Sequence, residues 1–318
     1  MGFIYDTYKK FSVDTVGHNY LKEHQDEYIE LDDEGIRELQ TCLLQMLQDI
    51  DQACRNSSID YALTGGNALG KIRHNGFVPW DDDIDLVMMR ADYDRFKEAF
   101  YKSGLSEKYL LRGPGCKEGA DFRCMKIYKK DSIMEQAFHK NNVQKKIFID
   151  IMPFDFVPDN HLYRRIKNIY CSFLIVALGS VDFKKNFCTE LKNEMRKSFI
   201  GWINIALRTL LGTVFGIIPL QTWYKMYDRA PVYKKETKFG TVYNGKLLYI
   251  DEIVPVDYYY PFVDCEYCGV KTRIIHKPEE YLAFRYGDYM KIPEKKDRET
   301  HIVKSINVDI SEQGEINQ

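Results

Sequence analysis

Four aspartates fall within five consecutive positions of this chain, namely Asp81, Asp82, Asp83 and Asp85. Like-charged carboxylates repel one another, so such a cluster is unfavourable unless cations neutralise part of its charge. Because successive side chains of a strand alternate between faces, Asp82 is expected to point away from the other three. Two or three carboxylates on one face suit a hard cation such as Mg²⁺ or Mn²⁺. The segment therefore predicts a divalent-metal site.

A solvated acidic loop and a calcium-binding loop are the alternatives to this metal site. An EF-hand loop requires a glycine and a later glutamate, and the glycine is missing here. A solvated loop does not usually run directly into an apolar strand, whereas these aspartates precede Leu86-Val87-Met88. The like-charge argument favours the divalent-metal interpretation.

Gly65 and Gly66 lie shortly upstream, between an expected strand and an expected helix. Glycine lets the backbone approach a ligand closely, and a helix N-terminus presents free amides to a phosphate. With Asn67, these glycines are candidates for holding a phosphate that also contacts a metal at Asp83 and Asp85. A Gly-Gly turn is common on its own, so this assignment depends on its position before the acidic segment.

Asp150 stands in the apolar run Phe148-Ile149-Asp150-Ile151. A carboxylate among apolar neighbours is costly to bury unless it is paired or bound to a metal. Asp150 is therefore a candidate metal ligand, or the base for an acceptor hydroxyl. The alternative is a hydrogen-bonded aspartate of the core.

A mixed framework of helices and strands must position these residues. The patterns predict helices at 34–54, 68–74 and 92–100, and strands at 59–63, 83–89, 122–128 and 147–152, the last ended by Pro153. This order suggests an α+β or α/β core over roughly residues 57–160. Farther along, a strand is expected at 247–250 and a helix at 278–286.

The segment 161–230 differs from this core in composition. Its runs 169–181 and 199–223 are apolar, but the first is too short for a membrane span and Arg208 interrupts the second. A buried helical subdomain and helices lying on a bilayer both stay open. We divide the chain into an N-terminal helical segment (1–56), a catalytic core (57–160), a helical insertion (161–240) and a C-terminal section that completes the active site (241–318).

Bulk composition excludes some classes of protein. The 45 lysines and arginines against 47 acidic residues argue against a binder of duplex nucleic acid. Eight cysteines in 318 residues indicate a reducing compartment rather than a disulfide framework. Cys265 and Cys268 have the spacing of half a zinc site, but no second pair accompanies them. Without an apolar signal segment, a cytoplasmic location is expected, with association at the inner face of a membrane as an extension.

The motifs together resemble the signature of the LicD family. The resemblance covers the run from Leu63-Thr64-Gly65-Gly66-Asn67 to Trp80-Asp81-Asp82-Asp83-Ile84-Asp85, and continues through 90–96 and 149–155. It returns near the C-terminus at 281–282, 286–290, Pro293 and 298–301, whereas 161–240 carries no matching motif. Asn67 departs from the family, in which a small hydroxyl residue is frequent at this position.

The resemblance implies an α+β nucleotidyltransferase-like fold, of the polymerase-beta type, with an added helical subdomain. It also implies transfer of a phospho-substituent from a cytidine diphosphate donor, with release of CMP. The best-known activity moves phosphocholine from CDP-choline to a sugar of teichoic acid, lipopolysaccharide or capsule precursors, and other relatives are linked to ribitol phosphate. The expected partners are thus a CDP-alcohol donor, a glycan or lipid-linked glycan acceptor and a peripheral membrane contact, without nucleic acid.

Residue roles follow as hypotheses. Asp83 and Asp85, with Asp81 and Asp150, would hold Mg²⁺ or Mn²⁺, and Asp150 is the first choice for the base. The remaining candidates fall into three groups: Arg73 and Lys126 for the charge on phosphate, His74, His301, Arg298, Asp288 and Tyr286 for acid-base or acceptor contacts, and Tyr258, Tyr259, Tyr260, Tyr281 and Tyr286 for an aromatic cage around choline.

Two other functions remain open at this level. Nucleotidyl transfer to a small molecule would use the same carboxylates and glycines, and differs in leaving the nucleoside monophosphate on the acceptor. A non-catalytic scaffold for cell-envelope assembly is the other, and the intact aspartates weigh against it.

Overall fold

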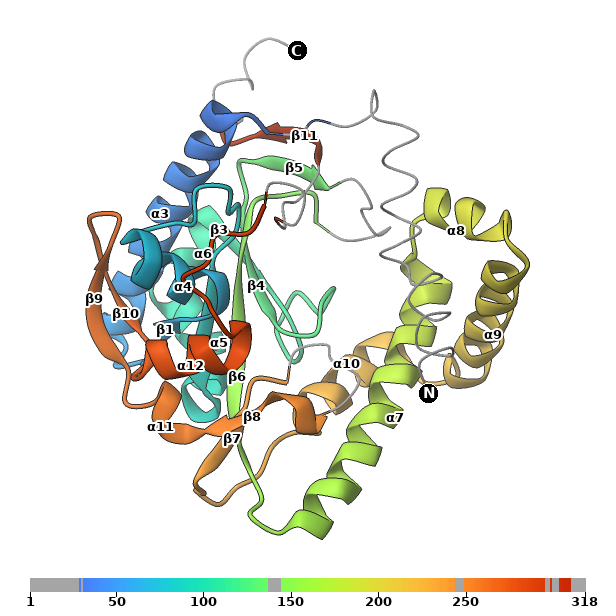
Figure 1. The fold of residues 1–318 in the computed structure, drawn as a ribbon. Helices are drawn as coiled ribbons and strands as arrows, with labels where there is room; N and C mark the ends of the chain where they lie inside the picture. Colours follow the sequence, from blue (N-terminus) through green and yellow to red (C-terminus); the bar gives the residue numbers. More distant parts are fainter. Residues whose placement is uncertain are drawn as a thin grey trace.

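The computed structural model describes residues 29, 31–136, 144–243, 249–294, 298 and 303–309. In this part of the chain, a mixed nine-stranded sheet has the order β3-β4-β6-β2-β1-β10-β9, and β7 and β8 extend it beside β6 (Figure 1). Its strands are β1 (Ala62–Leu63), β2 (Asp85–Met89), β3 (Tyr109–Arg112), β4 (Met125–Lys129), β6 (Phe148–Val157), β7 (Phe239–Thr241), β8 (Ile253–Pro255), β9 (Val263–Tyr267) and β10 (Val270–Ile274). A separate pair is formed by β5 (Ile133–Gln136) and β11 (Val303–Asn307).

The sheet combines parallel and antiparallel neighbours. β2 runs parallel to β6, and β1 runs parallel to β10, whereas β1–β2 and β4–β6 are antiparallel. The expected α+β class with a mixed sheet is therefore confirmed. Strands from the C-terminal section join the same sheet as those from the core, because β10 pairs directly with β1.

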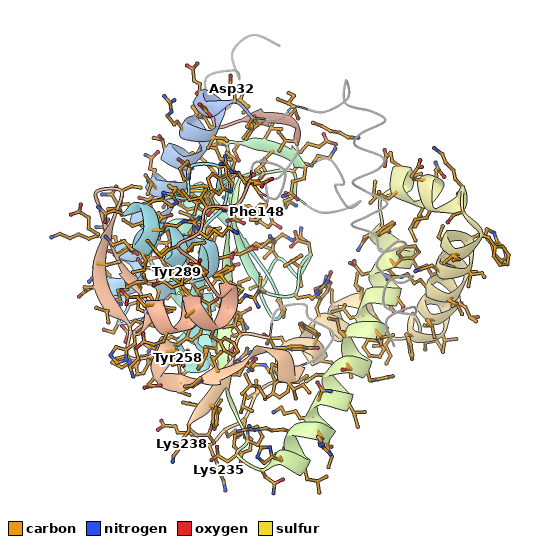
Figure 2. All side chains as sticks on the ribbon, in the orientation of Figure 1. Asp32, Phe148, Lys235, Lys238, Tyr258 and Tyr289 are labelled. Carbon is orange, nitrogen blue, oxygen red and sulfur yellow. The ribbon has the colours of Figure 1, made fainter. Side chains whose placement is uncertain are left out.

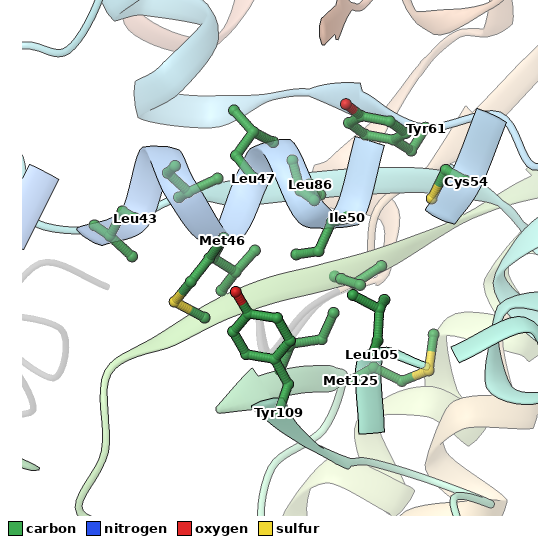
Figure 3. Close-up of a cluster of buried hydrophobic side chains, with 14 of the residues drawn as sticks. Leu43, Met46, Leu47, Ile50, Cys54, Tyr61, Leu86, Leu105, Tyr109 and Met125 are labelled. Atoms are coloured by element: carbon green, nitrogen blue, oxygen red, sulfur yellow. The ribbon is translucent and has the colours of Figure 1, made fainter. Parts of the chain in front are cut away.

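One face of the sheet is covered by α3 (Asp33–Asn56), α5 (Arg90–Lys102) and α6 (Leu105–Lys108). The Asp32 side chain caps α3 by accepting from the Gly35 amide at 2.8 Å. Leu43, Leu47 and Ile50 are fully or almost fully buried, and Figure 3 shows them facing side chains of the sheet and of α6. Each such burial contributes about 1.5–3 kcal/mol. The apolar stripe predicted for 34–54 is thus the inner face of a core helix.

The opposite face carries α4 (Gly65–His74), α11 (Val256–Tyr259) and α12 (Pro278–Tyr286). Because side chains alternate along a strand, β2 sends Leu86 to the core under α3 and Val87 to the core under α4 and α12. Asp85 therefore shares the α4 side with Val87. Lys126 of β4 and Asp150 of β6 are paired in register and flanked by residues of the α3 core, so they project on this side too.

After β6 the chain forms four helices, α7 (His161–Asn186), α8 (Thr189–Arg196), α9 (Phe199–Phe215) and α10 (Leu220–Arg229). They share a third core that includes Leu174, Leu178, Trp223 and Tyr227. By length and composition α7 could cross a membrane, although half of its most apolar window is buried. α9 and α10 are long and apolar enough to cross a membrane only when they are taken together, and the chain bends by 91° between them.

Arg90 connects the sheet to the core of these four helices. Its guanidinium donates to both carboxylate oxygens of Asp155 at 2.7–2.8 Å and to Asp228 Oδ1 of α10 at 2.9 Å. Both aspartates are almost completely buried. Since one cation serves two buried carboxylates, this contact fixes α10 against the end of β6.

The prediction that Pro153 ends its strand is wrong, because β6 continues to Val157. Asp150 N donates to Ile84 O at 3.0 Å, and backbone directions alternate along a strand, so the nitrogen of Pro153 faces the other edge. There β4 pairs with β6 only up to Ile151, and β7 begins at Asp155. Proline thus occupies a gap between two partner strands, where no donor is needed.

The strand predicted at 247–250 is also wrong in its described part. Residues Tyr249–Glu252 form a 3₁₀ helix, and 247–248 lie outside the described residues. Tyr249 is fully buried against Tyr243, and Asn168 Oδ1 of α7 accepts from the Ile250 amide at 3.3 Å. These tertiary contacts favour a single turn. The helix predicted at 278–286 is confirmed with the same bounds as α12.

Candidate active site

A row of charged side chains crosses three adjacent strands on the α4 face of the sheet. Asp85 of β2 stands beside Asp150 of β6 in a parallel pair, and Asp150 stands opposite Lys126 of β4. Asp81 and Asp83 precede β2 and are partly exposed, whereas Asp82 between them is buried. This alternation is the one that the sequence predicted, although the strand itself begins only at Asp85.

The first turn of α4 lies directly against these carboxylates. Gly65 has φ +57°, and a Cβ atom there would stand 3.3 Å from Asp85 Oδ2. A Cβ atom on Gly66 would stand 3.0 Å from Asp81 Oδ2. Both predicted glycines therefore allow a close approach of backbone to acid. The positive end of the α4 dipole faces the same carboxylates and partly offsets their repulsion.

The carboxylates share one electrostatic field. Burial raises the pKa of Asp85 well above its ordinary value, and the negative charges of Asp83, Asp150 and Asp81 add to this effect, while Lys126 opposes it. Such a site favours a bound cation, because a cation would offset the cost of burying the Asp85 charge and its repulsion by the other carboxylates.

In the described part of the chain, no three His, Cys, Asp or Glu side chains converge as a complete metal-binding group. Mg²⁺ is commonly bound through one or two carboxylates together with phosphate oxygens of a substrate. The residues present therefore fit a metal that binds jointly with a phosphorylated donor better than one held by protein alone.

Lys126 is the cation of this row. Its Nζ lies 2.7 Å from Asp150 Oδ1 and 3.0 Å from Oδ2. The ammonium also lies 3.5 Å from the ring centroid of Phe148 and 4.4 Å from that of Phe122. The two rings hold the ammonium beside Asp150, where it can neutralise negative charge that develops on a phosphate.

Asn67 holds the acidic segment in place. Its Nδ2 donates to Asp83 O at 3.0 Å, and its Oδ1 accepts from Asp85 N at 2.5 Å. Gln40 Nε2 of α3 donates to Asp81 O at 2.8 Å. The Asn67 amide is thus engaged with the backbone on both sides of Ile84, which favours a positioning role over the phosphate contact expected from the sequence.

Sequence reasoning did not find Gln40 or the two phenylalanines beside Lys126. Gln40 lies on a helix that the periodicity assigned to packing alone, 41 residues before its partner. Phe122 and Phe148 read as ordinary apolar residues. Only their proximity to the acidic row in space could have indicated these residues. The sequence does not give this proximity, because it depends on which strands are neighbours in the sheet.

Arg73 and His74 lie at the end of α4, around Trp80. Arg73 Nη1 donates to the backbone oxygen of Tyr289, a residue labelled in Figure 2, at 2.8 Å, and its Nε donates to His74 Nε2 at 2.9 Å. Burial and the neighbouring Arg73 lower the pKa of His74, so the imidazole is neutral near pH 7. The Arg298 guanidinium stacks 4.0 Å over the Trp80 ring.

This cluster adjoins the acidic row through Trp80, which precedes Asp81. Arg73 links α4 to the segment after α12 through its hydrogen bond to Tyr289 O. Its contacts are therefore structural, whereas Lys126 is part of the acidic row. His301 lies outside the described residues.

The C-terminal candidates lie at different depths. Tyr286 is 44% exposed as a whole residue, but burial around its hydroxyl, then Tyr281, and also the charge of Asp85 raise its pKa, which indicates that the phenol oxygen points toward the acidic row. Asp288 is exposed. Tyr259 and Tyr281 are buried in the core under α12 and pack on each other. These two therefore serve packing, and a cage for choline cannot be built on their ring faces.

Cys265 and Cys268 lie on the hairpin of β9 and β10 with free thiols. Within the described ranges, neither belongs to a group of three side chains that could hold a metal.

Known proteins share this site region. Residues 58–193 match the LicD family model, described as the LicD/FKTN/FKRP nucleotidyltransferase domain. The chain is 24% identical over 269 residues to the lipopolysaccharide cholinephosphotransferase LicD of Haemophilus influenzae, which covers 85% of this chain and 96% of that protein. Uncharacterized proteins of Rickettsia typhi and Rickettsia prowazekii are 27% and 26% identical over 161 and 153 residues, which cover 46% and 53% of their lengths.

Proposed function

Since this chain belongs to the LicD family through residues 58–193, we propose that it is a metal-dependent phosphotransferase with a nucleotidyltransferase-like core. The enzyme moves phosphocholine, or a related phospho-alditol, from a CDP-activated donor to a hydroxyl of a cell-surface glycan or its lipid-linked precursor. The likeness over 96% of the Haemophilus cholinephosphotransferase supports this reaction class. The observation that carries the proposal is the row of Asp85, Asp150 and Lys126 beneath the N-terminus of α4.

Each part of the row has a role in this reaction. Asp83 and Asp85 would hold Mg²⁺ or Mn²⁺ together with the donor phosphates, with Asp81 at the edge. The bound ion supplies charge neutralisation to the pyrophosphate. The first-turn amides of α4 at Gly65 and Gly66 bind a phosphate oxygen, as helix N-termini do.

The chemical step uses the opposite end of the row. An acceptor hydroxyl oxygen attacks the phosphorus that carries the choline-like group, and the bond from this phosphorus to the bridging oxygen breaks. CMP leaves with the bonding electrons, and the hydroxyl proton passes to a carboxylate oxygen of Asp150. Lys126 balances the charge of Asp150 before the step and offsets charge on the transferred phosphate during it.

Turnover of purified protein with defined donors tests this proposal. CDP-choline, CDP-ribitol, CDP-glycerol, CTP and ATP are incubated with Mg²⁺ and a glycan acceptor, and CMP and pyrophosphate are quantified. We expect CMP release from one CDP-alcohol, loss of that release with EDTA, and a loss of at least about a thousandfold in Asp85→Asn. Pyrophosphate release from CTP or ATP would instead indicate nucleotidyl transfer. If no donor is turned over, donor binding measured by calorimetry would indicate that the right acceptor is missing, and no binding would indicate a non-catalytic member.

A further inference from the structure

The helices α7 and α9 carry apolar side chains on their outer surface. On α7 these are Leu162, Tyr163, Ile166, Ile169, Tyr170, Phe173 and Val176, each 44–70% exposed. On α9 they are Phe199, Ile200, Trp202, Ile203, Leu207, Leu210 and Val214, each 37–78% exposed. We call this set the α7–α9 face. Scattered exposed apolar residues are ordinary, whereas a continuous patch of this kind marks an interaction surface.

The two helices pack against each other, and their exposed stripes meet near Phe173 of α7 and Val214 of α9. The backbones approach closely where a Cβ atom on Gly212 of α9 would stand 2.4 Å from Ser180 O of α7. Phe173 of α7 contacts Phe215 at the end of α9, with ring centroids 5.7 Å apart. Figure 1 shows both helices at the edge of the molecule away from α3 and β9, and Figure 2 shows side chains projecting from their outer side.

Charge around the α7–α9 face identifies its partner. Segment 161–219 contains nine lysines and arginines against three acidic residues, in a chain whose net charge is −2. Arg165, Lys184, Lys185, Arg196 and Lys197 are exposed along or beside the apolar stripes. A second copy docked on the same face would bring like charges together. An anionic lipid surface satisfies both the apolar stripes and their basic border.

We propose that the α7–α9 face docks in the interface of an anionic phospholipid bilayer, with α7 and α9 lying along the membrane rather than crossing it. The inner side of α7 is committed to the protein, because Leu174 and Leu178 are buried against Trp223 and Tyr227. A spanning α7 would have to expose this core. Tyr163, Tyr170 and Trp202 suit the headgroup region, where an amphipathic ring has an apolar body and a polar edge.

Vesicle sedimentation of the full chain tests the docking without any donor, so its result is independent of the proposed reaction. Vesicles of phosphatidylcholine alone are compared with vesicles containing phosphatidylglycerol, at low and high salt. We expect binding to the anionic vesicles, weakened by salt. The variant Ile169→Glu/Trp202→Glu/Leu210→Glu should bind at least about tenfold more weakly. Its thermal unfolding confirms that it folds.

Two further variants sharpen the result. Val263→Glu introduces one carboxylate at an exposed apolar side chain, 42% exposed, on the distant strand β9, and should bind like the wild type. Arg165→Glu/Arg196→Glu should lose the preference for anionic vesicles. Failure of the wild type to bind anionic vesicles, or equal binding by the triple variant, would overturn the proposal. A dimer by light scattering that the triple variant converts to a monomer would also overturn it.

Discussion

Replacing Asp85 with Asn should make the protein more stable and inactive. Burial and the charges of Asp83, Asp150 and Asp81 raise the pKa of Asp85. A carboxyl whose pKa is higher in the folded protein than in the unfolded chain stabilises the fold below the unfolded pKa, and this stability is lost as pH rises through the folded pKa. At pH 7 the Asp85 charge therefore acts against folding. Asn keeps the shape of the side chain and removes this charge.

The expected gain is about 0.5–2 kcal/mol in the free energy of unfolding at pH 7, typical of relieving an unfavourable charge. For a chain of this size it corresponds to a rise of about 1–8 °C in Tm. The gain should vanish as pH falls toward 4, because Asp85 is then neutral in the wild type as well. Scanning calorimetry between pH 4 and pH 8 measures both effects.

Metal and donor should reverse the order of stability. On the proposed function, saturating Mg²⁺ with CDP-choline should stabilise the wild type by up to about 3 kcal/mol at a hundred times the dissociation constant, and Asp85→Asn should lose this increment. Asp82→Asn is the matched control, because Asp82 is buried whereas Asp81 and Asp83 on either side of it are partly exposed, and its variant should keep the metal response. The reasoning is refuted if Asp85→Asn is less stable than the wild type at pH 7 and still responds to Mg²⁺.

Three further substitutions probe the surroundings of the row. Lys126→Met removes the partner of Asp150 and should cost about 3 kcal/mol and at least about a hundredfold in turnover, with partial recovery in Lys126→Arg; urea unfolding and steady-state kinetics measure these. Asn67→Ala leaves the Asp85 amide without its acceptor and should cost about 1–3 kcal/mol and weaken Mg²⁺ binding in a titration. Arg90→Met removes the ion pair of the buried Asp155 and leaves the buried Asp228 with Arg229 alone, at 3.4 Å, and should cost about 3–5 kcal/mol at pH 7. Burial already raises the pKa of Asp155, so this cost should shrink as pH falls, and equal costs at pH 5 and pH 8 would contradict the account.

The sequence predicted the acidic segment well because its information is local. The period of two along 81–85 separates Asp82 from its neighbours, and the structure buries Asp82 and leaves Asp81 and Asp83 partly exposed. The turn before α4 is similarly local, because only glycine combines φ +57° with a close approach to Asp85. The helices and strands that the sequence predicted between 34 and 157 have the expected type for the same reason, whereas α6, β3 and β5 were not predicted.

Residues joined by strand order could not be predicted in this way. Lys126 meets Asp150 because β4 lies beside β6, and no periodicity encodes which strands become neighbours. Gln40 reaches Asp81 from a helix whose pattern indicates only packing. The prediction that Pro153 ends the strand was wrong because it assumed that one partner strand runs along the whole of β6. Instead, β6 pairs with β4 up to Ile151 and with β7 from Asp155. Apolar periodicity also does not distinguish the buried Leu174 from the exposed Ile169.

β6 links the acidic row to the α7–α9 face. The strand carries Asp150 near its start and Asp155 near its end, and α7 begins four residues after β6 ends. Arg90 donates hydrogen bonds to both Asp155 of β6 and Asp228 of α10, which fixes α10 relative to Asp150. Because α7 packs on α10, its position is fixed as well. Because the α7–α9 face is rigidly joined to the acidic row, it sets the distance between that row and a membrane bound by the face. For an acceptor attached to lipid, this geometry would present the hydroxyl at a constant distance from Asp150, which is the condition for efficient transfer in a positioned complex.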